Sequence, residues 1–308
     1  MNNQPDTPPV EDMRCGFVAV IGAPNAGKST LINLMIGTKV SIVSHKVQTT
    51  RSTLRGIAIA GNAQIVFIDT PGIFKPKRRL DRAMVNRAWS GAGDADFVLF
   101  LVDARKGIDE ETRKIAEGLA DLQQDVLLVL NKIDLVERDS LLQLTRDLNE
   151  LHGFSETFMI SALKGDGVED LKKHLADRCQ PGHWHFPADQ ISDAPKYYIA
   201  AEITREKLYN RLHDELPYAS TVETESWLDQ KDGSIRIEQV IFVMRDSQKP
   251  IVIGKGGRTI KDIGAEARVE LSEVLGCKVH LFLFVKVRGK WGDDPARYKA
   301  MGLDFPRD

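Results

Sequence analysis

Short apolar runs alternate with amphipathic stretches along the first 180 residues of the chain. Apolar residues recur at helical spacing over residues 27–36, 80–90, 109–122, 139–152 and 167–179. Strands that alternate with helices in this way predict an α/β domain, whose mostly parallel sheet is covered on both faces by helices. The runs that fit buried strands are FVAVIG, LRGIAIA, AQIVFID, ADFVLFLVD, DVLLVLN and TFMIS.

The pattern changes after residue 180. Residues 179–195, CQPGHWHFPADQISDAP, contain three prolines and no periodicity, which indicates a linker. Beyond it we expect a strand near 197–203, the helical stretch REKLYNRLHDEL, and strands at about 218–229 and 234–244. The run PIVIG, a GKGG loop, a long helix to about residue 275 and the strand KVHLFLFVKVR complete a smaller α+β domain.

These changes divide the chain into four parts. Residues 1–14 are polar and rich in proline, so we expect a disordered tail. The first domain then covers residues 15–180 and the linker covers residues 181–195. The second domain and a C-terminal tail occupy residues 196–308.

The composition is that of an ordinary globular protein, with 42% apolar residues, 28% charged residues and a net charge of -2. A nearly neutral chain binds nucleic acid only through a local patch. Cys15, Cys179 and Cys277 are far apart and odd in number, which fits reduced thiols rather than a disulfide framework. No apolar run approaches the length of a membrane span, so the sequence predicts a soluble, cytoplasmic protein.

The segment after the first strand matches a phosphate-binding loop. GAPNAGKS, residues 22–29, fits the pattern G-x-x-x-x-G-K-[ST] between a strand and a helix. Gly22 and Gly27 let backbone N–H groups approach phosphates, the helix start adds its positive end, and Lys28 reaches the β- and γ-phosphates. The predicted nucleotide-binding residues here are Gly22, Ala23, Pro24, Asn25, Ala26, Gly27, Lys28, Ser29 and Thr30.

A second motif predicts a Mg2+ site. DTPG, residues 69–72, ends the strand AQIVFID, so Asp69 stands where it can hold the Mg2+ shell together with the Ser29 hydroxyl. The N–H of Gly72 reaches the γ-phosphate and moves when that phosphate leaves. We therefore assign catalytic roles to Lys28, Asp69 and Gly72.

Two further motifs determine which base is bound. NKID, residues 131–134, follows a buried strand, and guanine presents two donors that the Asp134 carboxylate accepts side by side. Adenine presents a lone pair at N1 instead, which the carboxylate repels. Asn131 contacts the base edge and the stem of Lys132 covers the ring. A backbone N–H for the guanine carbonyl comes from the SAL segment, which is Ser161, Ala162 and Leu163. Together these motifs predict GTP rather than ATP.

In these motifs the sequence resembles the translation-factor-like GTPases. The segment VQTTRS, residues 47–52, stands where such proteins carry a switch loop with a Mg2+-binding threonine. The resemblance favours Thr50 for this role, which adds Thr50 to the catalytic residues, and leaves Thr49 as the alternative. Ile73 stands where Ras-like GTPases carry the Gln that orients the attacking water, so we expect slow intrinsic hydrolysis. Relatives with Asn at the place of Asn25 often use a K+ ion near the phosphates, which implies stimulation by K+ here.

The GKGG loop in the second domain predicts an RNA-binding site. Its glycines let a nucleic-acid backbone come close, and the helix start and nearby cations attract phosphates. We expect unstacked bases to lie in a groove walled by Ile251, Val252, Ile253, Ile260 and Ile263. The loop and the order of elements resemble a type II K-homology domain, whose GXXG loop clamps single-stranded RNA. The predicted RNA-binding residues are Gly254, Lys255, Gly256, Gly257, Arg258 and Lys261.

A GTPase domain joined to a C-terminal K-homology domain resembles the bacterial Era GTPases, over about residues 14–300. The resemblance implies binding of the 3′ end of small-subunit ribosomal RNA and a role in assembling the 30S subunit. It implies that GTP favours RNA binding, that RNA stimulates hydrolysis and that hydrolysis drives release. It further implies Mg2+ as cofactor and a monomer, and leaves open a weak peripheral association with the inner face of the cell membrane.

Two other functions stay open at this point. One is an RNA-binding adaptor with a vestigial nucleotide domain, against which the intact Lys28, Ser29, Asp69 and Asp134 argue. The other is a peripheral membrane or cell-cycle signalling GTPase with incidental RNA binding. No basic amphipathic helix or lipidation signal supports that function.

Two groups of residues outside these motifs have alternative interpretations. Cys179, His183 and His185 are close enough to suggest a metal, but no fourth partner follows at a usual spacing, which favours a solvated linker. Near the C-terminus, charged and aromatic residues fit RNA contacts and a soluble edge strand equally well. These residues are Lys286, Arg288, Lys290 and Trp291.

Overall fold

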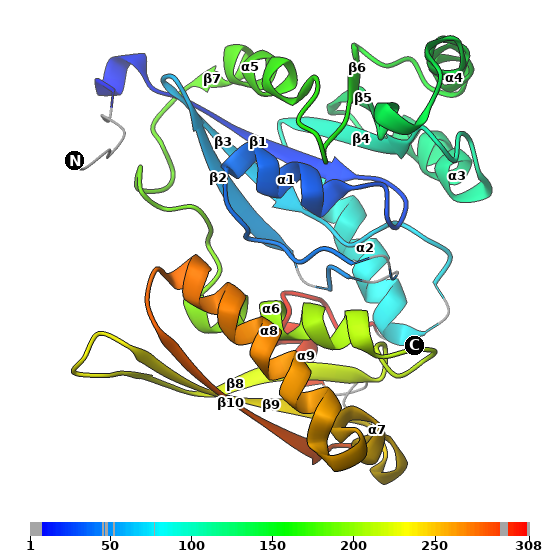
Figure 1. The fold of residues 1–308 in the computed structure, drawn as a ribbon. Coiled ribbons are helices and arrows are strands. Elements are labelled where there is room, and N and C mark those ends of the chain that lie inside the picture. The colour runs from blue at the N-terminus through cyan, green and yellow to red at the C-terminus, as the bar shows by residue number, and fades with distance from the viewer. Residues whose placement is uncertain are drawn as a thin grey trace. The chain divides into compact units, whose positions relative to one another are not determined.

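The computed structural model describes residues 8–44, 46, 49–51, 53–76, 78–289 and 295–306. They divide into two compact units (Figure 1). The first unit comprises the described residues of Met1–Ser41, Thr50–Asp193 and Tyr298–Asp308. The second comprises those of Ile42–Thr49 and Ala194–Arg297.

The first unit is built on one sheet in the order β2-β3-β1-β4-β5-β6, which confirms the predicted mostly parallel arrangement. Within this order only the edge strand β2 runs antiparallel to its neighbour, and the two-residue strand β7 (Gln180–Pro181) pairs antiparallel with the start of β1. The strands are β1 (Arg14–Ile21), β2 (Leu54–Ala60), β3 (Ala63–Asp69), β4 (Phe97–Asp103), β5 (Asp125–Asn131) and β6 (Thr157–Ile160).

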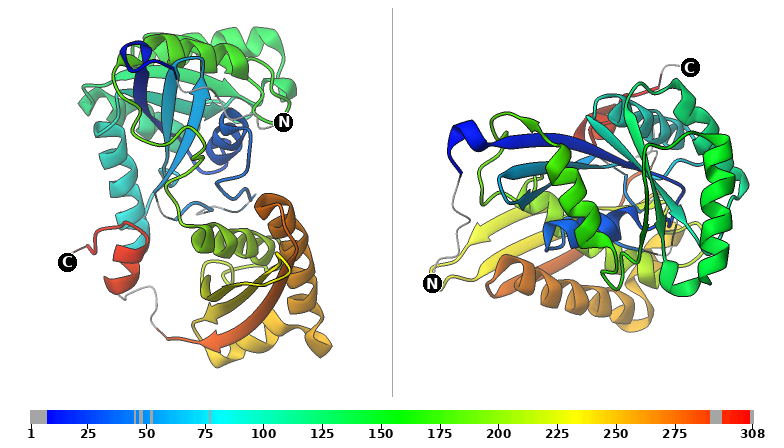
Figure 2. Two further views of the ribbon diagram at one scale, coloured as in Figure 1. Left: turned by 90° about the vertical axis from the view of Figure 1, so that its left-hand side faces the viewer. Right: turned by 90° about the horizontal axis from the view of Figure 1, so that it is seen from above.

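Helices cover both faces of this sheet (Figures 1 and 2). On one face α1 (Lys28–Ile36) and α5 (Val168–Arg178) contact each other and the strands. The other face packs against α2 (Arg79–Gly93), α3 (Glu110–Gly118) and α4 (Arg138–Leu151). The parallel strands all end at the same edge of the sheet, where ligands bind in open α/β folds.

The second unit is a three-stranded sheet with helices on one face (Figure 2). β10 runs parallel to β9, and β9 runs antiparallel to β8, the mixed arrangement that fits the predicted type II K-homology topology. Its core lies between the sheet and the pair α6 and α8. The elements are α6 (Lys196–Arg211), β8 (Ser220–Asp229), β9 (Ile235–Val243), α7 (Lys249–Ile253), α8 (Arg258–Leu275) and β10 (Val279–Val287), followed by α9 (Pro295–Ala300), whose residues from Tyr298 group with the first unit.

One predicted element of the second domain was wrong. The strand expected near residues 197–203 is the first half of α6, because Ala200, Thr204 and Leu208 recur four residues apart and bury one helical face. The run PIVIG up to Ile253 forms most of helix α7 (Lys249–Ile253), as expected for a GKGG loop between two helical stretches, and the first turn of α7 contains Pro250. Proline is favoured there because its missing N–H has no helical partner in any case.

The predicted domain boundaries also need correction. Residues 10–14 are not a disordered tail, because Val10–Asp12 form a 3-10 turn and Arg14 begins β1. Residues 1–7 lie outside the described residues. Residues 181–193 are bonded to the first unit, with the N–H of Ile57 donating to the Ile191 carbonyl at 2.9 Å. The C-terminal residues from Tyr298 also group with the first unit, where the Tyr298 and Phe305 rings meet edge to face.

Within the described part of the chain, no helix combines the length and apolar character that a membrane crossing requires.

Helix α7 allows a direct test of the fold of the second unit. Val252 is fully buried in its core, whereas the neighbouring Ile251 is 59% exposed. Val252→Ala should lower the free energy of unfolding of this unit by about 2 kcal/mol, and Ile251→Ala by less than about 0.5 kcal/mol. Hydrogen exchange of the β9 amides measures both changes. Equal effects would contradict the helical assignment.

Candidate nucleotide site and RNA-binding loop

The phosphate loop between β1 and α1 depends on its two glycines. Gly27 has φ +105°, and a Cβ there would lie 2.2 Å from Nδ2 of Asn131. A Cβ on Gly22 would lie 2.3 Å from the Leu101 carbonyl oxygen. Asn25 also has positive φ, at +63°. With these backbone conformations the loop packs tightly against β4 and β5. Helix α1 begins directly after the loop, at Lys28.

Lys28 is almost completely buried beneath this loop, with 6% of the residue exposed. Its Nζ donates to the carbonyls of Gly22 and Ala23, both at 3.1 Å. Burial lowers the pKa of Lys28 from 10.5 to about 8, and the charge of Asp69 opposes this shift. An anionic group beside the loop would restore the charged form of the amine.

Asp69 at the end of β3 accepts hydrogen bonds from three hydroxyl groups. Its Oδ2 accepts from Ser29 Oγ at 3.2 Å, from Thr50 Oγ1 at 3.3 Å and from Ser41 Oγ. Its Oδ1 is buried and has no hydrogen-bond partner among the described residues. Burial raises the pKa of Asp69, and the hydroxyl donors oppose this shift. A carboxylate oxygen without a partner, beside hydroxyl oxygens, is a suitable ligand set for Mg2+.

The two threonines of the switch segment have different environments. Thr50 Oγ1 lies 3.1 Å from Ser29 Oγ, so the structure brings Thr50, Ser29 and Asp69 together. Thr49 instead donates its hydroxyl to the Lys46 carbonyl at 2.7 Å. Of the two residues, Thr50 has the geometry of a Mg2+ ligand. Val47, Gln48 and Ser52 of the predicted segment lie outside the described residues.

The DTPG turn packs directly on the phosphate loop. Thr70 Oγ1 donates to the Val20 carbonyl at 2.7 Å, and the N–H of Ile73 donates to the Gly22 carbonyl at 3.1 Å. A Cβ on Gly72 would lie 3.1 Å from Pro24 atoms, so the turn is close enough to share a phosphate with the loop. The Ile73 side chain is buried in the core, and its apolar atoms cannot orient water.

Asn131 joins the base-recognition motifs to the phosphate loop. Its Nδ2 donates to the Ala26 carbonyl at 2.7 Å. Its Oδ1 accepts from the N–H of Lys132 at 2.8 Å and from that of Ala162 at 2.9 Å. Lys132 Nζ donates to the Asn25 carbonyl at 2.7 Å. The four predicted motifs of the first domain therefore meet at one edge of the sheet.

Asp134 lies beside the SAL segment. A hydrogen bond from Ser161 and the nearby Lys164, 3.6 Å away at Nζ, lower the pKa of Asp134. An ionised carboxylate can accept two donors side by side. Ser161 and Ala162 are buried, whereas Leu163 is 83% exposed.

The GKGG loop lies between α7 and α8 in the second unit. Gly254, Gly256 and Gly257 have φ of +76°, +61° and +77°. A Cβ on Gly254 would lie 2.2 Å from Thr259 Oγ1, whereas one on Gly256 would meet nothing within 4 Å. Gly254 is thus needed for the turn itself and Gly256 faces open space. Lys255, Arg258 and Lys261 are exposed around the 18-residue helix α8.

The predicted apolar wall of this site needs correction. Val252 and Ile263 belong to the core of the second unit, and Ile253 and Ile260 pack partly buried against it. Only Ile251 of the five is largely exposed. The other four side chains pack into the core of the second unit and support the loop, so they do not form an exposed groove.

The structure shows the environments of several members of the two other residue groups. Cys179 is buried, and no cluster of metal-ligating side chains occurs among the described residues. Lys286 Nζ pairs with Glu225 at 2.9 Å, and Arg288 lies over the Phe242 ring. Lys290 and Trp291 are outside the described residues.

The family models match both domains: "50S ribosome-binding GTPase" matches residues 17–132 and "KH domain" matches residues 215–292. GTPase Era of Bradyrhizobium sp. (strain ORS 278) is 63% identical over 295 residues, covering 96% of each chain. That of Brucella suis biovar 1 (strain 1330) is 63% identical over 293 residues, covering 95% of this chain and 94% of its own. The chain belongs to the Era GTPase family.

Solved Era structures have the same fold. Era of Aquifex aeolicus in a variant form bound to GDP and AlF4- is 38% identical with a TM-score of 0.88, covering 94% of this chain and 99% of its own. Era in complex with MgGDPNP and nucleotides 1506–1542 of 16S ribosomal RNA gives the same values. The protein is therefore a GTPase, with a P-loop GTPase domain followed by a K-homology domain.

Sequence reasoning missed three side chains of this Era GTPase. Ser41 bonds Asp69, and Asn33 holds the backbone of Val40 and Ser41 through Oδ1, both at 2.9 Å. Asp103 at the end of β4 bonds Lys132 Nζ at 2.6 Å. Ser41 and Asn33 belong to no recognisable motif. Asp103 ends a buried apolar strand, a position that is typical of residues in a ligand site.

The buried amine of Lys28 predicts a pH-dependent step in nucleotide binding. Because its pKa is about 8 and phosphate raises it, binding should take up about half a proton at pH 8 and almost none at pH 6.5. Affinity should then fall as the pH rises above about 8. Calorimetry in two buffers with different ionisation heats measures the uptake.

The matched control for this prediction is Lys28→Arg, since a guanidinium stays charged at every pH used. Proton uptake that does not change with pH, or that persists in this variant, would show that another group is responsible.

Proposed function

We propose that this Era GTPase is a GTP-controlled switch that binds the single-stranded 3′ end of small-subunit ribosomal RNA and assists assembly of the 30S subunit. The observation that carries the proposal is the pairing of a complete nucleotide site with an open GXXG loop in one chain. The relative whose structure contains 16S ribosomal RNA nucleotides supports the choice of RNA. A ribosomal RNA ligand also supports a cytoplasmic location. Membrane association and a monomeric state stay predictions from the family resemblance.

Each nucleotide-site residue has a role that follows from its position. We assign the phosphates to the N–H groups of residues 22–30 and to Lys28, and the guanine to Asn131, Lys132, Asp134 and the SAL segment. Ser29, Thr50 and Asp69 would hold Mg2+. When bound, Mg2+ would supply positive charge that neutralises the charge developing on the phosphates.

The switch segment supports a link between nucleotide state and the RNA-binding domain. Thr50 contacts Ser29, while the described residues of the preceding segment Ile42–Thr49 belong to the second unit. There the fully buried Arg205 donates to the Thr49 carbonyl, and the N–H of Val43 donates to Glu206 at 2.9 Å. Loss of the γ-phosphate at Thr50 thus acts on a segment that α6 holds.

Guanine recognition by Asp134 predicts a change of base in one variant. Xanthine carries a carbonyl where guanine carries its exocyclic amine, so it suits an amide better than a carboxylate. Asp134→Asn should lower GTP affinity about 100-fold and raise XTP affinity. Competition binding with both nucleotides measures this, and a variant that still prefers GTP would contradict the assignment.

RNA binding by the GKGG loop has a matched control at the other end of the same helix. Gly256 and Gly276 have φ of +61° and +65°, and a Cβ on either meets nothing within 4 Å. Asp at each position therefore adds the same charge and similar backbone strain. Gly256→Asp should weaken binding of a ribosomal 3′-end oligonucleotide about 100-fold, and Gly276→Asp less than about threefold. Similar losses in both would remove the loop from the RNA site.

The role of Asn25 predicts faster hydrolysis in K+ than in Na+. The left-handed backbone of Asn25 suits glycine, so Asn25→Gly removes the side-chain amide without adding strain. We expect about tenfold stimulation by K+ in the wild type and little in the variant. Equal turnover of the wild type in the two salts would rule out a K+ site.

A further inference from the structure

Asp103 is a buried carboxylate that none of the nucleotide motifs includes. It ends strand β4, between the strands that lead into the phosphate loop and the NKID loop. Its side chain is 4% exposed. A buried charge is tolerated only when it is paired and hydrogen-bonded, so its partners show what it holds.

The main partner is Lys132, whose Nζ lies 2.6 Å from Asp103 Oδ2. The same Nζ donates to the Asn25 carbonyl at 2.7 Å. The Lys132 ammonium is thus fixed at both sides, by β4 and by the phosphate loop. Its backbone is held as well, at φ +67°, by the hydrogen bond to Asn131 Oδ1.

The carboxylate is itself rigidly held. Asp103 Oδ1 accepts from the N–H of Arg105 at 3.1 Å, and its carbonyl accepts from the N–H groups of Lys106 and Gly107. The next N–H, that of Ala104, donates to the Asn131 carbonyl at 2.9 Å. Asp103 is therefore part of the backbone structure that carries the base-recognition loop.

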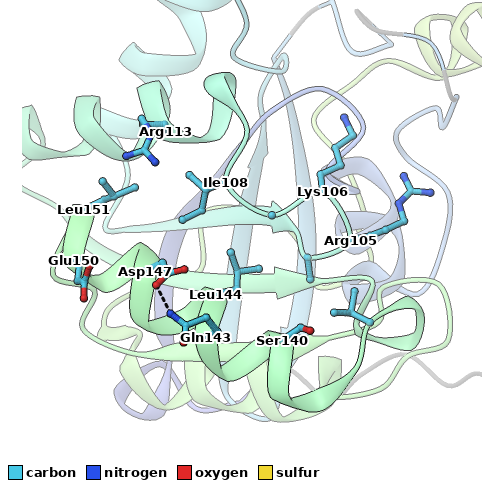
Figure 3. A pocket seen from close by; sticks show the side chains of 13 residues that line it. Arg105, Lys106, Ile108, Arg113, Ser140, Gln143, Leu144, Asp147, Glu150 and Leu151 are labelled. Atoms are coloured by element: carbon cyan, nitrogen blue, oxygen red, sulfur yellow. Dashed lines mark hydrogen bonds between the residues drawn. The ribbon is translucent and has the colours of Figure 1, made fainter.

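The remaining partner faces solvent. Arg105 Nη2 lies 3.4 Å from Asp103 Oδ2 and its side chain is 55% exposed. With Lys106 and Arg113 it lines a cavity of about 720 Å³ next to α4 (Figure 3). None of the residues assigned to the nucleotide lines this cavity. Arg105 can thus be replaced without removing a nucleotide contact.

We propose that Asp103 is a positioning residue for nucleotide binding. Its carboxylate holds the Lys132 ammonium against the phosphate loop, so the lysine stem is in place before the base arrives. A long side chain that is already ordered loses less entropy when the ligand binds. This inference rests on the proposed role of Lys132 in covering the guanine ring.

The contacts of Lys132 and Asp134 with the base can be distinguished by their dependence on the nucleotide. A stem that covers the ring face acts on any purine, whereas Asp134 reads the donors at the edge. ITP lacks the exocyclic amine, so only the Asp134 contact distinguishes it from GTP. Loss of Asp103 should therefore weaken GTP and ITP equally and leave their affinity ratio unchanged.

The test measures GDP dissociation from the full chain and the GTP-to-ITP affinity ratio. Asp103→Asn should release GDP about tenfold faster with an unchanged ratio, since it loses a charged hydrogen bond to Lys132. Lys132→Ala should release GDP at least as fast. Two controls should stay within about twofold: Arg105→Ala, and Asp125→Asn, which removes a carboxylate from the ion pair with Arg178 at the start of β5.

A double-mutant cycle distinguishes positioning from general damage. If Asp103 acts through Lys132, Asp103→Asn adds almost nothing in the Lys132→Ala background. Full additivity, or a changed GTP-to-ITP ratio, would overturn the inference, as would an unchanged rate in Asp103→Asn beside a raised rate in Lys132→Ala. An unchanged rate in Lys132→Ala would instead overturn the proposed role of Lys132, on which the inference rests.

Discussion

The hydrogen bonds of the Asn131 side chain are the interaction on which the nucleotide site depends. One amide group bonds the phosphate loop at Ala26, the NKID loop at Lys132 and the SAL segment at Ala162. The amide fits only because Gly27 has no Cβ, which would lie 2.2 Å from Nδ2. A site in which phosphate and base loops share one buried anchor is ordered before the nucleotide arrives, and preorganisation lowers the entropy cost of binding.

The buried charges of this site favour the binding of a charged ligand. Lys28 and Asp69 are removed from water, and burial destabilises the charged form of each. Carbonyls and hydroxyls satisfy part of their bonding capacity, and a phosphate with its metal ion would complete it. The same hydroxyl cluster includes Thr50, next to a segment that packs in the second unit. In the proposed function, the switch and the hydrolysis of GTP would therefore depend on the same few atoms.

The sequence was sufficient for the fold class and the nucleotide loops because both depend on local pattern. A buried parallel strand is a continuous apolar run, and loops such as GAPNAGKS need glycine at fixed spacing. The prediction from sequence failed where tertiary contacts determine the local structure. The stretch at Tyr197–Ile203 carries aromatic and β-branched residues but forms a helix, since its burial follows a four-residue spacing. Asn33, Ser41 and Asp103 act through partners distant in sequence, which no spacing shows.

The central claim is that the nucleotide site and the GKGG loop form one switch, and GTP turnover with and without RNA tests it most directly. The full chain would be assayed in K+ buffer with an oligonucleotide that copies the ribosomal 3′ end and with a scrambled oligonucleotide. The account predicts faster turnover with the matching sequence only. Turnover that is the same with both oligonucleotides and without RNA would contradict it, leaving a GTPase and an RNA-binding domain that act independently.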